Sequence, residues 1–218
     1  MFPSSLAPPR HARLQRVLAV VALFVAVVTL AACSLSRPAP VKRTFLLEPT
    51  LPAAAGTPKP AAVRIGVVNV AAPFRGKTFV FRESDLRYEA DYYDEFFIAP
   101  AIMFSDATAK ALAASNVFRR VVPFGAASDE GDFVLDGFVS ELYGDTRDPA
   151  APTAVLTVTY YLTPTNVIGS GVAWTREYRQ RVKVAGSGTE AVARGLNAAL
   201  SAILAELARD LAAAELPK

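Results

Sequence analysis

The residue with the clearest capacity for covalent chemistry is Cys33. It is the only cysteine in the chain of 218 residues, and an ionised thiol is a nucleophile that other groups can modify. An apolar run from Val17 to Ala32 precedes it, behind a basic segment that holds Arg10, Arg13 and Arg16. The run has about 16 residues, fewer than the roughly 20 needed to span a bilayer, and it ends in small residues. This order of segments predicts a secretory signal peptide, residues 1–32.

The four residues Leu30-Ala31-Ala32-Cys33 resemble the bacterial lipobox, which is cleaved directly before its cysteine. The resemblance implies cleavage between Ala32 and Cys33, a diacylglycerol thioether on the sulfur and an N-acyl (palmitate-type) chain on the new amino group. One acyl chain holds a protein only marginally, whereas several anchor it stably. We expect no other cofactor. The next residue is Ser34, not the aspartate that retains many lipoproteins at the inner membrane, so the periplasmic face of the outer membrane is favoured.

Removal of residues 1–32 changes the charge and the chemistry of the chain. The three signal-peptide arginines account for the precursor's net charge of +3, so the mature chain is formally neutral and no nucleic-acid partner is expected. The only histidine, His11, leaves with the signal. Zinc sites built from Cys and His, Ser-His-Asp triads and disulfides within one chain are thereby excluded. We expect a protein that is not an enzyme and holds no metal.

The mature chain begins with a segment rich in proline and alanine, residues 33–62. Such segments favour extended conformations and act as spacers, and we predict a tether with a first strand near residues 42–48. The folded domain is expected over residues 63–218. Its predicted strands are 63–70, 78–82, 86–92, 117–124, 132–143, 153–163 and 171–184, from β-branched content and alternation.

Two helices are predicted in this domain. One covers residues 100–115 and ends at Asn116. The other follows a capping-box pattern, Ser187-Gly-Thr-Glu190, and carries an apolar stripe that should pack on the sheet. The stripe is Val192, Leu196, Leu200, Ile203, Leu207 and Leu211. The sum is an α+β fold: a mostly antiparallel β-sheet with two helices packed on one face.

Three further features are candidate sites. Glu89, Asp91, Asp94 and Glu95 offer four carboxylates, for an acid–base pair or calcium, although a solvated strand end or a partner surface explains them as well. Arg179, Arg181 and Lys183 share one strand face and suit anionic headgroups or an acidic partner, or a plain solvated face. Phe74 lies in a predicted loop, where it could touch lipid or a neighbouring subunit, or cap the core.

Two stretches resemble a known family. They are Phe79–Phe97, which runs Phe-Val-Phe-Arg-Glu-Ser-Asp-Leu-Arg-Tyr-Glu-Ala-Asp-Tyr-Tyr-Asp-Glu-Phe-Phe, and Leu112–Val121, which runs Leu-Ala-Ala-Ser-Asn-Val-Phe-Arg-Arg-Val. With the early Phe45-Leu-Leu-Glu-Pro49 strand and the long final helix, they resemble the ABC-type transport auxiliary lipoprotein family, which includes the lipoprotein of the paraquat-inducible membrane system. Many members have an Arg-Trp-Ala-Glu-Pro-Leu-type sequence before the first helix. This chain has Glu95-Phe-Phe-Ile-Ala-Pro100 there, which marks a divergent member.

The resemblance implies a non-catalytic accessory of an envelope lipid-transport system. Its partners would be an ABC permease and ATPase and a mammalian-cell-entry-type protein, with the lipoprotein as outer-membrane dock or adaptor and possible homo-oligomerisation. The chain lacks a phosphate-binding glycine loop, so it is not itself the ATPase. Two alternatives stay open: a lipoprotein that activates peptidoglycan synthesis or assists outer-membrane biogenesis, since fold does not fix function, and a hydrolase that uses carboxylates only.

Overall fold

The computed structural model describes residues 18–23, 41–54, 56–127, 130–165, 171–186 and 188–217. The chain divides into two compact units, Met1–Val41 and Lys42–Lys218. In the first unit the described residues 18–23 are helical and exposed. The predicted processing and attachment site, Ala32 and Cys33, lies outside the described residues. Signal cleavage and the lipid anchor therefore stay predictions.

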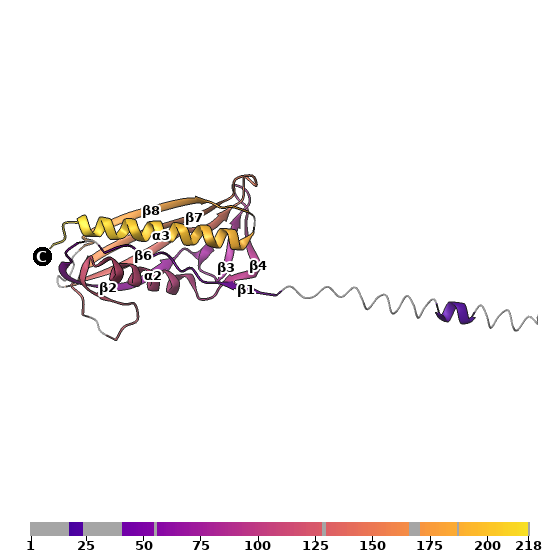
Figure 1. The fold of residues 1–218 in the computed structure, drawn as a ribbon, viewed down its shortest axis with the longest axis horizontal. Coiled ribbons are helices and arrows are strands. Elements are labelled where there is room, and N and C mark those ends of the chain that lie inside the picture. The colour runs from indigo at the N-terminus through magenta and orange to yellow at the C-terminus, as the bar shows by residue number, and fades with distance from the viewer. Residues whose placement is uncertain are drawn as a thin grey trace, which may run out of the picture. The chain divides into compact units, whose positions relative to one another are not determined.

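The second unit contains eight strands in one sheet (Figure 1). The strands are β1 (Arg43–Phe45), β2 (Lys59–Val70), β3 (Thr78–Arg82), β4 (Tyr88–Phe96), β5 (Phe118–Val122), β6 (Phe133–Asp145), β7 (Thr153–Pro164) and β8 (Trp174–Lys183). Hydrogen bonding orders them β1-β4-β3-β6-β2-β5, and β7 pairs with β6 and with β8. Strands β1 and β5 therefore lie at opposite ends of the six-strand path.

The α+β class is confirmed, and the pairing within the sheet is mixed. The long ladders β6–β7 and β7–β8 and the hairpin β3–β4 are antiparallel. The pairs β1–β4, β2–β5, β2–β6 and β3–β6 are parallel. A parallel neighbour requires a crossover connection. Between β2 and β5 this connection contains the hairpin β3–β4 and helix α2. Alternation along a strand shows its faces but not its partner's direction, so the sequence did not reveal these parallel pairs.

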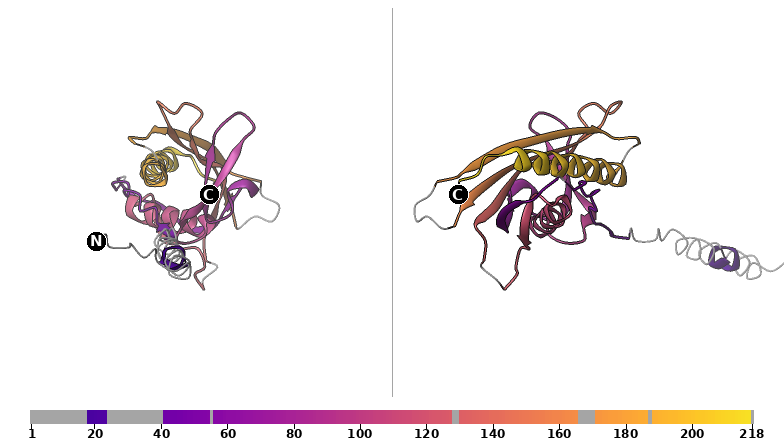
Figure 2. Two further views of the ribbon diagram at one scale, coloured as in Figure 1. Left: turned by 90° about the vertical axis from the view of Figure 1, so that its right-hand side faces the viewer. Right: turned by 60° about the vertical axis from the view of Figure 1, so that its left-hand side comes forward.

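Helices α2 (Pro100–Ser115) and α3 (Thr189–Ala213) pack on the same face of the sheet (Figure 2). Helix α2 ends as predicted at Asn116, whose φ of 54° is left-handed. All six residues of the predicted stripe of α3 are buried. This helix is long and apolar enough to cross a membrane, but 61% of its most apolar window is buried against the fold. Within the described residues it is a core helix.

The start of α3 differs from the predicted capping box. The helix begins at Thr189, its N-cap is Gly188 at φ 89°, and no side chain caps it. Thr189 instead donates its hydroxyl to the Oδ2 atom of Asp91 on β4, at 2.6 Å. The residue that the box would use as its cap, Ser187, lies outside the described residues.

The folded unit starts earlier than the predicted boundary at residue 63. It begins at Lys42, and β2 begins at Lys59, where the Lys59 amide donates to the Val117 carbonyl. Leu47 is buried in the core, and the Thr50 amide donates to Ser201 Oγ on α3 at 3.0 Å. Residues 42–62 are rich in proline, but the described part of this segment contributes to the folded unit and is not simply a spacer.

Candidate functional site

The three predicted cations of β8 share the sheet face that points away from the helices. On the opposite face of β8, Tyr178 donates to Asp210 Oδ2 at 2.7 Å and Gln180 donates to Glu206 Oε1 at 2.9 Å, both on α3. Residues alternate along a strand, so Arg179, Arg181 and Lys183 lie on the uncovered face. The sequence placed them correctly on one side of the strand.

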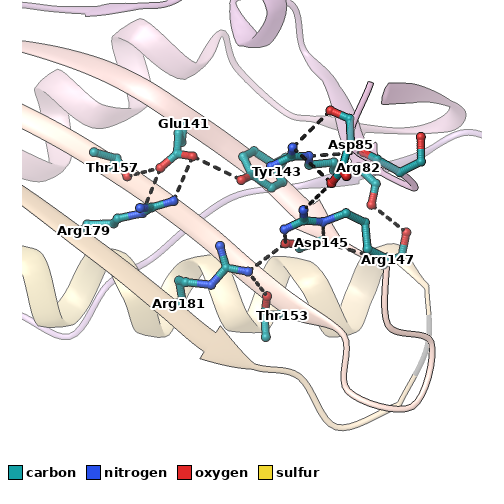
Figure 3. Close-up of polar contacts among 12 residues, drawn as sticks. Arg82, Asp85, Glu141, Tyr143, Asp145, Arg147, Thr153, Thr157, Arg179 and Arg181 are labelled. Atoms are coloured by element: carbon teal, nitrogen blue, oxygen red, sulfur yellow. Dashed lines mark hydrogen bonds and ion pairs between the residues drawn. The ribbon is translucent and has the colours of Figure 1, made fainter. Parts of the chain in front are cut away.

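Arg179 is bound to a carboxylate two strands away (Figure 3). Its Nε atom lies 3.1 Å from Glu141 Oε2 on β6. The register aligns Glu141 with Thr157 and Thr157 with Arg179, and Thr157 also donates to Glu141 Oε2 at 2.6 Å. One row of side chains therefore links β6, β7 and β8.

Asp145 is the centre of the second group in Figure 3. Arg147 donates to both of its carboxylate oxygens, at 3.0 and 2.8 Å, and Arg181 donates to Oδ2 at 2.7 Å. The hydrogen bonds from Arg147, and then those from Arg181, hold the pKa of Asp145 well below its usual range although burial opposes them. Arg147 also pairs with Asp85 at 2.9 Å.

These ion pairs limit what the uncovered face can bind. A hollow of about 420 Å³ lies beside Asp145, Arg147 and Arg181, but both arginines already hold the buried carboxylate. An anion would have to compete with Asp145 for them. Lys183 is exposed and has no ion pair among the described residues. Within the described ranges, the arrangement is a network of ion pairs with the exposed Lys183 at its end.

Of the two roles that the sequence left open for Phe74, the structure favours packing against the core over contact with lipid or a neighbouring subunit. Phe74 belongs to a short 3-10 helix, η2 (Ala72–Phe74), and is buried. Its ring stacks on Tyr143 with centroids 5.8 Å apart and meets the edge of Tyr88 at 6.4 Å. Apolar side chains on short loops often close a core in this way, because burying a phenylalanine stabilises the fold by about 1.5–3 kcal/mol.

The four carboxylates of β4 do not form a joint site. Asp94 is buried and accepts two hydrogen bonds from Arg43, at 2.8 and 2.5 Å. These bonds hold the pKa of Asp94 below its usual range, so it is not suited to act as a general acid. Asp91 accepts the amides of Tyr93 and Asp94 at 2.9 and 3.0 Å. Among the described residues, no cluster of His, Cys, Asp or Glu could hold a metal ion.

The sequence reasoning missed Glu141, Asp145 and Arg43 as partners of the charged residues. Glu141 and Arg179 are separated by 38 positions, and Arg43 and Asp94 by 51. Only the strand register brings each pair together. The signal available in the sequence was the row of like charges on β8, which calls for carboxylates on the neighbouring strands.

The sequence profile of the ABC-type transport auxiliary lipoprotein component family matches residues 45–212. This chain belongs to that family. The match begins at Phe45, the last residue of β1, and ends one residue before the end of α3, so β2 to β8, α2 and nearly all of α3 belong to the family domain. A comparison with functionally curated proteins found no match.

Two solved structures with TM-scores above 0.5 share this fold. A DUF330-family protein from Xanthomonas campestris has a TM-score of 0.68 at 15% identity, over 76% of this chain and 92% of its own. An uncharacterised protein has a TM-score of 0.59 at 15% identity, over 78% and 99%. The PelC dodecamer from Paraburkholderia phytofirmans gives a TM-score of 0.42 at 19% identity, over 74% and 94%. At these identities the first two matches show the fold alone.

Proposed function

We propose that this family member is a non-catalytic dock or adaptor of an ABC-type envelope lipid-transport system. The mature chain would be anchored through acylated Cys33 to the periplasmic face of the outer membrane. Its partners would be a mammalian-cell-entry-type protein and, through it, the inner-membrane permease and ATPase. The proposal includes assembly of several copies of this chain into a homo-oligomer.

The observation that carries the proposal is the family match over residues 45–212, which follows directly on a lipobox and a short linker in the sequence. The charged groups of the domain support a binding role over catalysis. Asp94, Asp145 and Glu141 are each held by arginine. These bonds lower the pKa of Asp94 and that of Asp145, and a carboxylate kept ionised in this way cannot deliver a proton to a substrate.

Co-purification in mild detergent tests the partner. The acylated chain, tagged at its C-terminus, should recover the mammalian-cell-entry-type protein of the same cell. The Cys33→Ala variant is the matched control, since it keeps the sequence of the folded domain and should stay unlipidated. Density fractionation of the membranes assigns the anchored chain to the outer or the inner membrane.

Recovery of a peptidoglycan synthase or an outer-membrane assembly protein in place of the transport component would contradict the proposal and favour the alternative function.

A carboxylate-only hydrolase is tested separately. Changing Glu89, Asp91, Asp94 and Glu95 one at a time should leave complementation of a deletion strain intact wherever the variant folds, and loss of complementation by a folded variant would favour catalysis.

A further inference from the structure

Strand β4 contains an outward bulge that carries two tyrosines. The pairs Val80–Ala90 and Thr78–Glu95 leave a longer stretch of β4 than of β3 between them, and extra residues in one strand bend it outward. Tyr92 and Tyr93 lie in this stretch with their ring centroids 4.9 Å apart. They are 77% and 42% exposed.

Two carboxylates, the half-buried Asp91 and the buried Asp94, hold the bulge in place. Asp91 accepts the amides of Tyr93 and Asp94 through Oδ1 and the hydroxyl of Thr189 through Oδ2. Asp94 is bound by Arg43 of β1. The tyrosines are thus presented on a support that is tied to both α3 and β1.

Two more exposed apolar side chains continue the surface. Phe97 is 60% exposed and Leu46 is 48% exposed. The Phe97 amide donates to the Phe45 carbonyl at 2.8 Å, directly after the register pair Phe45–Phe96, so Phe97 and Leu46 are neighbours. Phe96, the chain neighbour of Phe97, and Asp94, two positions before Phe96, are buried. We call Tyr92, Tyr93, Phe97 and Leu46 the aromatic strip.

We propose that the aromatic strip rests on the lipid headgroup layer of the membrane that holds Cys33. The proposal rests on the lipid anchor of the proposed function. Ten residues separate Cys33 from Arg43, and an extended chain spans at most about 3.6 Å per residue, so Arg43 stays within roughly 35 Å of the anchor. Arg43 is bound to Asp94, the residue next to Tyr93. This edge of the sheet, where the chain enters the folded domain, is therefore within linker reach of the bilayer.

The chemistry of the strip suits a bilayer surface. Tyrosine is enriched at membrane interfaces because its ring is apolar and its hydroxyl stays hydrated. Glu95 lies between Tyr93 and Phe97 and is half-buried, and its carboxylate limits the strip to the headgroup level. The contact gains little from charge, so it should persist at high salt.

The test places a fluorophore on the strip of the acylated protein in vesicles of phosphatidylethanolamine and phosphatidylglycerol. The thioether consumes the thiol of Cys33, so Tyr92→Cys supplies a single reactive thiol. Arg119→Cys on β5 is the matched control, since Arg119 is exposed and β5 ends the sheet path opposite β1. Nitroxide lipids labelled near the headgroup should quench the fluorophore at position 92 more strongly than lipids labelled deep in the chain, and should leave position 119 unquenched.

Equal quenching at both positions, or none at position 92, would overturn the proposal. Cross-linking between copies through position 92 without quenching would assign the strip to a second copy instead. In the Tyr92→Cys background, Tyr93→Ser with Phe97→Ser should reduce the quenching several-fold and leave the thermal midpoint unchanged. Mass spectrometry of the N-terminal peptide checks acylation separately: a missing acyl group refutes the anchor, whereas an acylated protein without quenching refutes only the strip.

Discussion

Replacing Gly195 with alanine sets two effects of known size against each other. Gly195 is a buried residue inside α3, where the helix crosses the sheet. A Cβ atom at this position would lie 2.6 Å from Ala154 Cβ and 2.6 Å from Val184 Cγ1, whereas carbon atoms prefer separations of about 3.5–4.0 Å. Alanine would favour the helix by about 0.8–1.0 kcal/mol over glycine, but overpacking a core costs about 1–3 kcal/mol.

At position 195 we expect the free-energy cost of the steric overlap to exceed the gain in helix propensity. Ala154 belongs to the buried strand β7, which is paired on both sides and cannot easily move. We therefore expect Gly195→Ala to lower the free energy of unfolding by about 1–2 kcal/mol, which corresponds to a fall in Tm of roughly 2–8 °C for a domain of this size. Urea and thermal unfolding of the mature chain, followed by circular dichroism, measure both.

Two further variants separate the effect of helix propensity from the cost of steric overlap. Ala198→Gly, at an exposed position of the same helix, should cost about 1 kcal/mol from propensity alone. Adding Ala154→Gly to Gly195→Ala should recover part of the loss, so that the double variant is more stable than the sum of the single effects. If Gly195→Ala is instead stabilising by the amount that Ala198→Gly loses, the close approach of α3 to β7 is refuted.

Three more predictions follow from the polar contacts. Asp145→Asn should lower the free energy of unfolding by about 1–2 kcal/mol, because it removes the charge-assisted bonds from Arg147 and Arg181; a value near zero in urea titrations at pH 7 would show that water replaces them. Folding lowers the pKa of Asp94 and that of Asp145. The stability that these two carboxylates contribute should therefore be complete above about pH 5 and decline as the pH falls below their unfolded pKa of about 3.9. Urea midpoints between pH 7 and 3 measure this decline, and the Asp145→Asn variant should show a flatter pH profile. Tyr160→Phe removes the hydroxyl that makes the 2.9 Å bond to the Thr108 hydroxyl in the core and should cost about 1 kcal/mol by thermal unfolding; an unchanged midpoint would show that this bond adds nothing to stability.

Most elements of the domain were predictable from the sequence because their signals are local. Proline at position 100 and asparagine at 116 mark the two ends of α2, and the alternation from Thr153 to Thr163 identifies β7. The boundary at residue 63 was misplaced because prolines usually indicate a spacer, whereas Lys59–Val70 is one strand that tolerates Pro60 near its start.

The candidate site was predictable only in part. Residue parity placed Arg179, Arg181 and Lys183 on one face, but their partners depend on strand register. Phe74 shows the same limit. A phenylalanine in a short loop is compatible with exposure and with burial, and only the rings of Tyr143 and Tyr88, which come from two other strands, decide that it is buried.

The sequence alone determined the predicted anchor and its chemistry. The predicted lipobox is a linear motif, so the expected modification of Cys33, and the loss of His11 and of the net charge that cleavage would bring, are inferred without tertiary structure. Tertiary structure decided which charges are already bound and which aromatic side chains are exposed. Burial and ion pairing depend on residues that are distant in the chain, as Arg43 and Asp94 are, and only the fold brings such residues into contact.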